Sequence, residues 1–596
     1  MASRTLPGRA AVGGSIRRCT VTSLLLCGLL CTQLACTRQG APSESTKDSP
    51  VQVYLAQRII TMDAIRPRAT AVAVEDGHIV AVGELHDIQR TLGDRAYEID
   101  QRFADKVLMP GFIEPHLHPY IAGILLPMEF ITPHDWALPG RQVQGVRGRD
   151  AYLARLQDHE KGLDEEQWLW TWGYHDLFHG KLSRADLDAV SAQRPIVVWH
   201  RSFHEIYLNS AAIEALGVDI ATAGGHPQVD LEAGRFYENG AKLLLPSLVP
   251  LLLEPGRYVS ALAEARSIIH AGGITTVGDA AFGTLNVESE FQALRAAGWD
   301  ATTTPFRTYL LTDGKSLGER AGHEGAPGII NLMPDRDLNR IRFLPQQVKL
   351  FADGAAYSQL MQMREPYLDG HSGEWLMDPA ELLAAARHYW NAGFQIHVHV
   401  NGDAGLDSTL DILQTLQQEN PREDHRFTIH HLAYARPDQA QRLMALGGMV
   451  QANPYYLWAL GDSYADHGLG VPRATHMVPL KSFAASGMRI ALHSDFTMAP
   501  AQPLLLVWAA VTRLTAEGNV FAVDERLDLH TALRGITIDA AFQMAQEEEI
   551  GSIEVGKLAN FTVLAQDPYQ LPIEKLKVIA IWGTVFEGLV YPLGQQ

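Results

Sequence analysis

The sequence predicts an α/β fold, a TIM-like (β/α)8 barrel in which parallel strands alternate with helices. Across residues 107–540, apolar runs typical of buried strands alternate with longer segments that carry helical periodicity, such as 380–390 and 438–446. Eight such runs can be counted, and eight parallel strands close a barrel of this kind. They span residues 107–115, 273–279, 305–311, 348–353, 394–400, 426–432, 449–454 and 489–495.

A long stretch separates the first of these strands from the second. It is far too long for one crossover, so residues from about 120 to about 255 are expected to form an inserted subdomain. This insert is rich in tryptophan, and two interpretations are open. The indoles build the insert's own core, or some of them line the mouth of a substrate site. The residues are Trp136, Trp168, Trp170, Trp172 and Trp199.

Both flanks of the barrel segment are predicted to be all-β. Residues 51–106 contain short apolar runs on either side of Glu75-Asp76-Gly77-His78, and Asp-Gly between apolar runs is a strong hairpin signal. Residues 541–596 have the same character, with strand-like runs at 561–564, 578–582 and 585–591.

The first 36 residues have the pattern of an export signal. They hold four arginines and no acid or lysine, and the apolar stretch 21–35 is shorter than a membrane-spanning helix requires. Leu34-Ala35-Cys36 resembles the end of a bacterial lipoprotein signal, although Gln33 stands where such signals prefer Leu. We expect an exported protein, either lipid-anchored at Cys36 through a flexible tether at 37–50 or unlipidated and periplasmic or secreted.

Cysteine usage and charge exclude several classes of function. All four cysteines lie in the leader, so the mature chain has no thiol nucleophile or thiol ligand. Loss of the leader's four arginines lowers the formal net charge from −19 by four, to −23. Because such an acidic chain repels phosphate backbones, nucleic acid is not an expected partner. A small-molecule substrate is expected instead, with a membrane involved only through the anchor at Cys36.

Histidines cluster at the ends of three predicted strands. His116 and His118 project to the same side of the first strand, at the end where barrel active sites lie, and imidazole is the commonest metal ligand. On the fifth strand His399 lies nearer the end, so His397 is interpreted as a deeper, structural residue. On the sixth strand His430 and His431 are adjacent, and strand parity lets only one of them face the barrel interior.

Two further residues could complete a metal site. Asp495 follows the eighth strand, where it could bind metal and take a proton from metal-activated water; a helix cap or an Asx turn is the alternative role. Lys349 lies inside the apolar fourth strand, where a charged ammonium is costly. Either a salt bridge neutralises it, or carbon dioxide converts it to a carbamate that bridges two cations.

At these motifs the chain resembles the amidohydrolase superfamily, and within it the large amidohydrolases that include N-substituted formamide deformylases. The resemblance covers most of the mature chain. The run 551–559 resembles the family's return from the barrel, which implies that both chain ends form one small β-sandwich. The other matching segments are 109–112, 116–118, 273–277, 348–354, 399–403, His431 and 494–495.

The resemblance implies a two-metal hydrolase that cleaves a non-peptide carbon–nitrogen bond with metal-activated hydroxide. Zinc is common in the family. The implied roles are His116 and His118 on the first ion, Lys349 as carboxylated bridge, His399 and His431 on the second ion, and Asp495 as ligand and general base. The catalytic residues implied are therefore Asp495, Lys349 and His431.

The sequence departs from the family pattern at three places. His430 stands where Glu is usual, which is expected to alter the support for His431. Asn560 replaces an Asp far from the barrel mouth. The insert has Tyr237-Glu238-Asn239 where relatives approach the acid through more hydrophobic residues, so substrate preference is not transferred. The substrate-pocket candidates are Tyr174, His175, His204 and Tyr455.

Two other functions remain open from the sequence. A one-metal deaminase or ester hydrolase could use the same scaffold with Lys349 unmodified. A lipid-tethered binding protein without catalysis is the alternative from another class.

Overall fold

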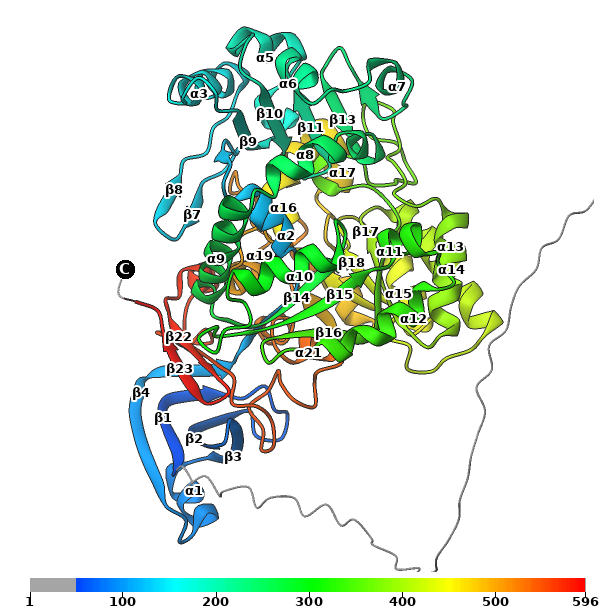
Figure 1. The fold of residues 1–596 in the computed structure, drawn as a ribbon. Coiled ribbons are helices and arrows are strands. Elements are labelled where there is room, and N and C mark those ends of the chain that lie inside the picture. Colours follow the sequence, from blue (N-terminus) through cyan, green and yellow to red (C-terminus); the bar gives the residue numbers. More distant parts are fainter. Residues whose placement is uncertain (1–49, 595–596) are drawn as a thin grey trace, which may run out of the picture. The chain divides into compact units, whose positions relative to one another are not determined.

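The computed structural model describes residues 50–594 (Figure 1). The export signal predicted at 1–36, including Cys36, lies outside the described residues, as does the tether up to residue 49. Within 50–594, no helix combines the length and apolar character that crossing a membrane would require.

Eight parallel strands form the barrel at the centre of the structure, in the predicted order along the chain. Because helices cover the outside and side chains fill the inside, nearly every residue of these strands is buried. The strands are β5 (Phe112–Leu117), β14 (Ile274–Phe282), β15 (Arg307–Asp313), β16 (Ile341–Phe351), β17 (Gln395–Val400), β18 (Thr428–His431), β19 (Met449–Ala452) and β20 (Ile490–Leu492).

The barrel is closed between its first and last strands just beyond the end of β20. The Asp495 amide donates to the His116 carbonyl at 3.1 Å, and the His118 amide donates to the Phe496 carbonyl at 3.2 Å. The buried Glu114 side chain of β5 also accepts the Ser494 amide at 3.0 Å. The predicted (β/α)8 barrel is thus confirmed, and its seam carries two of the predicted ligands, His116 and Asp495.

Helices α9 (Pro255–Ala271), α10 (Val287–Ala296), α13 (Pro379–Asn391), α14 (Asp403–Glu419), α15 (Pro437–Ala445) and α19 (Pro503–Thr512) surround the barrel. Their N-termini follow the expected local rules. Asp378 caps α13 and Asn286 caps α10 through side-chain acceptors, and proline occupies the first turn of α9, α13, α15 and α19.

Both ends of the chain build one seven-stranded sheet, in the order β23-β22-β21-β4-β1-β2-β3. Antiparallel pairing of β21 with β4 joins the two ends. A core around Phe103, which packs against Tyr54 and Trp582, closes one face of the sheet. The β-domain shared by the two ends is therefore confirmed. Its strands are β1 (Val51–Ile60), β2 (Arg68–Glu75), β3 (His78–Gly83), β4 (Tyr97–Pro110), β21 (Phe561–Leu564), β22 (Ile581–Phe586) and β23 (Leu589–Pro592).

A single residue, Gly111, separates β4 of this sheet from β5 of the barrel. A Cβ atom at Gly111 would lie 2.0 Å from the Thr275 hydroxyl of β14, so no larger residue fits without displacement. The Pro-Gly step at 110–111 is therefore the place where the chain passes tightly from one sheet to the other.

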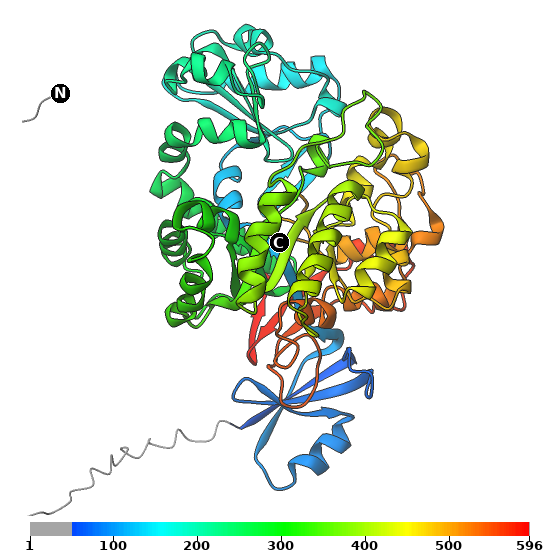
Figure 2. The same cartoon turned by 90° about the vertical axis from the view of Figure 1, so that its right-hand side faces the viewer.

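The segment between β5 and β14 forms a six-stranded sheet of its own, in the order β12-β13-β11-β10-β9-β6. Figure 2 shows this insert, in cyan and green, beyond one end of the barrel, with the seven-stranded sheet beyond the other. The strands are β6 (Glu129–Phe130), β9 (Leu169–Tyr174), β10 (Ile196–His200), β11 (Glu205–Leu208), β12 (Val229–Asp230) and β13 (Arg235–Tyr237).

Each of the two interpretations of the tryptophan-rich insert holds for different residues. Trp136 and Trp172 pack edge to face in the insert's core, with ring centroids 5.6 Å apart. Trp168 and Trp170 stack on one another and are half-buried. Trp199 reaches the wall of the cavity described next.

Candidate metal centre

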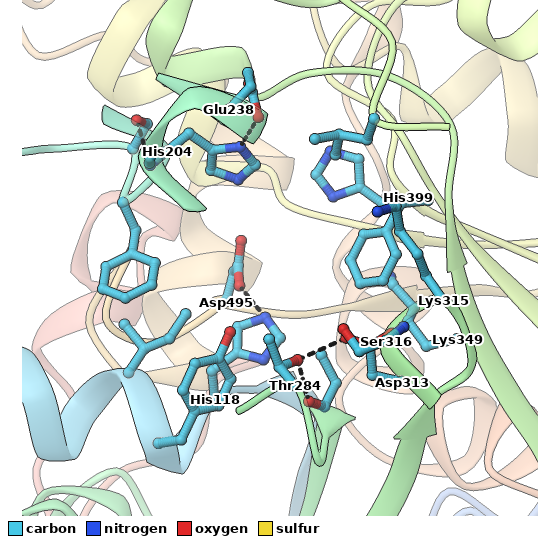
Figure 3. A pocket seen from close by; sticks show the side chains of 18 of the residues that line it. His118, His204, Glu238, Thr284, Asp313, Lys315, Ser316, Lys349, His399 and Asp495 are labelled. Carbon is cyan, nitrogen blue, oxygen red and sulfur yellow. Dashed lines mark hydrogen bonds and ion pairs between the residues drawn. The ribbon is translucent and has the colours of Figure 1, made fainter. Parts of the chain in front are cut away.

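A cavity of about 260 Å³ opens at the C-terminal ends of the barrel strands, beneath the insert (Figure 3). Seven strands or strand ends of the barrel contribute side chains to it. All six residues that the sequence singled out as ligands lie on its wall, namely His116, His118, Lys349, His399, His431 and Asp495.

The tightest group of donors comes from the seam of the barrel. The Nε2 atoms of His116 and His118 lie 3.2 Å apart. Asp495 Oδ1 lies 3.1 Å from His118 Nε2 and 3.6 Å from His116 Nε2. One donor atom from each residue lies within 4.8 Å of the other two, which is close enough for a shared ion. Because zinc takes imidazole and carboxylate donors, the group fits a divalent cation.

His431 enters the same site through an unusual backbone conformation. Its φ is 80°, a left-handed value rare outside glycine, and it turns the ring inward at the end of β18. The expectation that only one of His430 and His431 faces the interior is therefore wrong, because strand parity ends where the backbone leaves the extended conformation. His431 Nδ1 lies 3.7 Å from Asp495 Oδ2 and 3.2 Å from the Tyr456 hydroxyl.

His399 is held by the loop that follows β17. Its Nε2 lies 2.9 Å from the Asn401 side-chain nitrogen, and its ring centroid is 4.3 Å from that of His431. The buried Asp353 carboxyl accepts the backbone amides of Asn401 and Gly402, both at 2.8 Å. The motifs at 348–354 and 399–403 are thus two halves of one brace that positions His399.

Lys349 is buried on β16 and faces the cavity beside these histidines. Among residues 50–594, its Nζ has neither a hydrogen-bond partner nor a carboxylate within salt-bridge distance. Burial lowers the pKa of the Lys349 amine well below its usual value. The salt bridge considered from the sequence is therefore not formed, and burial favours the neutral form of the amine.

Burial also lowers the pKa values of three histidines of the group, His116, His399 and His431, well below their usual value. Their rings are therefore neutral, which is the form that binds metal. A further histidine, His493, lies next to this group, and the sequence argument had not selected it. It stacks on His116 with centroids 4.3 Å apart, and it could share an ion with His116 and His431.

A family model described as the amidohydrolase family matches residues 104–591. The chain belongs to the amidohydrolase family. It is accordingly an enzyme of the kind that hydrolyses carbon–nitrogen bonds other than peptide bonds, and the resemblance read from its motifs is confirmed.

Several known proteins are similar to this amidohydrolase over nearly its whole length. An N-substituted formamide deformylase of Arthrobacter pascens is 26% identical over 543 residues, which cover 89% of this chain and 96% of the relative. Protein LONG AFTER FAR-RED 3 of Arabidopsis thaliana is 26% identical and covers 86% of each chain. The crystal structure of an uncharacterised metal-dependent hydrolase from Pyrococcus horikoshii OT3 shares the fold, with a TM-score of 0.65, 20% identity and coverage of 88% and 99%.

Of the four substrate-pocket candidates, His204 alone lies on the described wall of the cavity. Tyr174 lies in the insert's core, where its hydroxyl donates to the Gly180 carbonyl at 2.8 Å. His175 caps a short helix of the insert, and Tyr455 is buried against Trp458. The sequence places all three near the mouth, but it does not reveal in which direction each ring points.

His204 is paired with an acid that the sequence argument did not select. Its Nδ1 lies 2.9 Å from the Glu238 carboxylate, which is almost fully buried (Figure 3). Burial alone would lower the pKa of His204, but the charge and hydrogen bond of Glu238, together with the charges of Asp495 and Glu205, outweigh it, so the pKa is raised. The pair lies across the cavity from Asp495 and His118, and it makes the insert a polar wall of the amidohydrolase site.

Proposed function

We propose that this amidohydrolase cleaves the carbon–nitrogen bond of an N-substituted amide, formamide or cyclic amide, using two zinc ions. The observation that carries the proposal is the convergence of six side chains on one cavity, including a buried lysine without a hydrogen-bond or salt-bridge partner in the described chain. His116 and His118 would hold one ion, His399 and His431 the other, and Lys349 and Asp495 would lie between them.

Divalent ions bound there would polarise a substrate carbonyl and lower the pKa of water toward neutrality. Asp495 accepts a proton from the attacking water and returns it to the leaving nitrogen. Its carboxylate is 7% exposed and close to His116, His118 and His431, so it is shielded from bulk solvent. The histidines orient the site, and the insert excludes water above it.

Lys349 would bridge the ions as a carbamate. Its neutral Nζ attacks the carbon of carbon dioxide, an N–C bond forms, one C=O π bond becomes an oxyanion, and a proton leaves the nitrogen. The depressed pKa of the Lys349 amine and the lack of a described partner for Nζ support this step. The product is an anion with two oxygen donors, and bound cations would offset the cost of burying its charge.

The cavity wall supports a substrate with an apolar substituent on nitrogen. Carbon-rich side chains from the insert, from the helix after β5 and from the loop after β20 line much of the cavity, beside the polar pair of His204 and Glu238 and the ligands at the strand ends. The similarity to a formamide deformylase supports a formyl or small acyl group at the metal end. The apolar wall includes Tyr120, Ile121, Trp199, Phe203, Ile206, Leu245 and Met498.

Metal analysis of the purified protein tests the proposal. We expect about two ions per chain, together with a carbamate signal in ¹³C NMR after incubation with labelled bicarbonate. Lys349→Ala should lose the signal and at least one ion. Lys315→Ala is the matched control, because Lys315 also lines the cavity but pairs with Glu319 at 2.5 Å.

The other outcomes separate the alternatives. One tightly bound ion with full activity would identify a one-metal enzyme with unmodified Lys349, and a panel of matched amides, amines and esters would name its reaction class. A metal-loaded chain that hydrolyses no member of the panel would support the non-catalytic binding protein. Retention of both ions by Lys349→Ala would exclude the bridge.

We also propose that the chain is exported and anchored through Cys36. The arginine-rich, apolar leader and the polar stretch 37–50 support this, and the residues concerned lie outside the described structure. Wild type should partition with membranes and the Cys36→Ser variant with the soluble exported fraction. Equal partitioning of the two would leave an unlipidated exported protein.

A further inference from the structure

Four buried polar side chains form a chain of hydrogen bonds from the barrel interior to the metal centre. Gln347 Oε1 of β16 lies 3.1 Å from His397 Nε2, and His397 Nδ1 lies 2.8 Å from His430 Nε2. His430 Nδ1 lies 2.7 Å from His116 Nδ1. None of the four residues is more than 3% exposed. A neutral amide is thereby connected to a metal ligand through two other imidazoles.

The direction of the chain is fixed at the Gln347 end. The side-chain nitrogen of Gln347 donates to the backbone carbonyl of Met544 at 3.2 Å. A carbonyl only accepts, so the amide cannot turn round without losing this bond, and the Gln347 oxygen must face His397. Since that oxygen also only accepts, His397 carries its hydrogen on Nε2.

The same reasoning passes along the chain, because a neutral imidazole has one N–H and one acceptor nitrogen. His397 Nδ1 accepts from Nε2–H of His430, and His430 Nδ1 accepts from Nδ1–H of His116. The Nε2 atom of His116 is left with a free lone pair. It is this atom that lies 3.2 Å from His118 Nε2 and 3.6 Å from Asp495 Oδ1.

We infer that Gln347 is a positioning residue that selects the metal-binding tautomer of His116, acting through His397 and His430. A metal-ligating histidine gains basicity and a fixed ring orientation from the acceptor of its other N–H. His430, which was expected to alter the support for His431, forms its side-chain hydrogen bonds with His397 and His116. The inference rests on the metal centre of the proposed function and holds for any substrate.

The test measures the zinc affinity of metal-free protein by competition with a chromophoric chelator. Gln347→Met has a similar shape but no acceptor, and it should weaken the tighter zinc site about 10-fold or more. Gln347→Glu retains an acceptor and should bind zinc as wild type does. Gln395→Met is the matched control, because Gln395 is buried at the paired position on β17 and, within residues 50–594, its side chain bonds only to Gln543 and Thr428.

A double-mutant cycle separates tautomer selection from a packing defect. In His430→Gln, the new amide can turn its oxygen toward His116 whatever occupies position 347. Adding Gln347→Met to this background should therefore cost no further zinc affinity. If Gln347→Met alone does not fold, the double variant of His430→Gln and Gln347→Glu takes its place. Its zinc affinity is then compared with that of each single variant.

Wild-type zinc affinity in Gln347→Met, or an equal loss in Gln395→Met, would overturn the inference. Additive losses in the double variant would also overturn it. These readouts do not depend on turnover. A chain that hydrolyses no amide but shows the expected zinc affinities would refute the proposed function and leave the role of Gln347 standing.

Discussion

The barrel mouth and the insert both wall the cavity, yet they are built in different ways. The barrel supplies its ligands from strand ends, where side-chain direction follows from pairing register. The insert supplies Phe203, His204 and Glu238 from turns and irregular backbone, and both Phe203 and Glu238 have positive φ. Regular strands thus place most of the proposed ligands, although His431 and Asp495 reach the site through left-handed backbone, and we expect the irregular insert to select the substrate.

Arg201 links the two regions. It is buried in the insert, with its guanidinium 4.5 Å from the Trp172 ring centroid, and it donates to the Met498 carbonyl of the barrel. Met498 follows Asp495 by three residues, and its amide donates to the Asp495 carbonyl at 2.6 Å. The insert therefore also bears on the chemistry, because it braces the loop that carries Asp495.

The largest expected effect is in the barrel, at Asp495. Asp495→Asn removes the group that takes and returns the proton, so kcat should fall by about 10² to 10⁴. Steady-state kinetics on the best amide substrate measure the loss, and metal analysis of the same sample shows whether the ions remain. An unchanged kcat would mean that proton transfer is carried out elsewhere.

A smaller effect is expected where the insert meets the barrel. Arg201→Lys keeps the charge but loses the planar fork, so the Asp495 loop should shift and kcat should fall by up to about 100-fold. Lost hydrogen bonds should also lower the free energy of unfolding by about 2 kcal/mol, measured by denaturant titration. Arg235→Lys is the control, since Arg235 pairs with Glu205 within the insert. Equal losses of kcat in both variants would show that Arg201 has no special role in positioning the Asp495 loop.

Substitutions inside the insert are expected to change KM, whereas those in the barrel change kcat. His204→Gln should raise KM about 10-fold, which corresponds to one lost charge-assisted hydrogen bond, with kcat nearly unchanged. Because Glu238 raises the pKa of His204, the protonated ring persists to higher pH and its contribution disappears as pH rises through that raised pKa.

Glu238→Gln removes the charge that raises the pKa of His204, and burial then dominates and lowers it. The rise of KM with pH should therefore begin at lower pH than in wild type. Profiles of KM against pH for the two proteins measure the difference. Superimposable profiles would show that His204 does not contact the substrate.

The smallest effect is expected at the apolar wall. Phe203 stacks on Trp199 with centroids 4.5 Å apart, and both line the cavity. Phe203→Leu should raise KM a few-fold for formamides with bulky N-substituents and leave an N-methyl substrate unaffected, because only the bulky group reaches the wall. Equal changes for both substrates would place the bulky group elsewhere.

The contrast between regular strands and irregular backbone also explains how much of the fold and of the site could be predicted from the sequence. Eight strands could be read from the apolar runs, and strand ends indicated five of the six cavity residues, whereas the choice of His431 over His430 came from the family resemblance. The left-handed backbone at His431 could not, since nothing in Ile429-His430-His431 signals it. Glu238 was visible as a departure from the family pattern, whereas Arg201, a charge directly after an apolar strand, had no signal that distinguished it.

The pairing of β4 with β21 has a consequence for the folding of the newly synthesised chain. The Phe112 amide bonds to the Thr562 hydroxyl, 450 residues later, and that hydroxyl donates to the Gly273 carbonyl at the start of β14. A ribosome needs on the order of 20 to 90 seconds for such a length. Until then one edge of β4 has unpaired backbone groups, and the hydrogen bonds of Thr562 to Phe112 and Gly273 are not formed. The sheet shared by the two chain ends, and the hydrogen bonds that join it to the barrel, can therefore form only after nearly the whole chain has been synthesised.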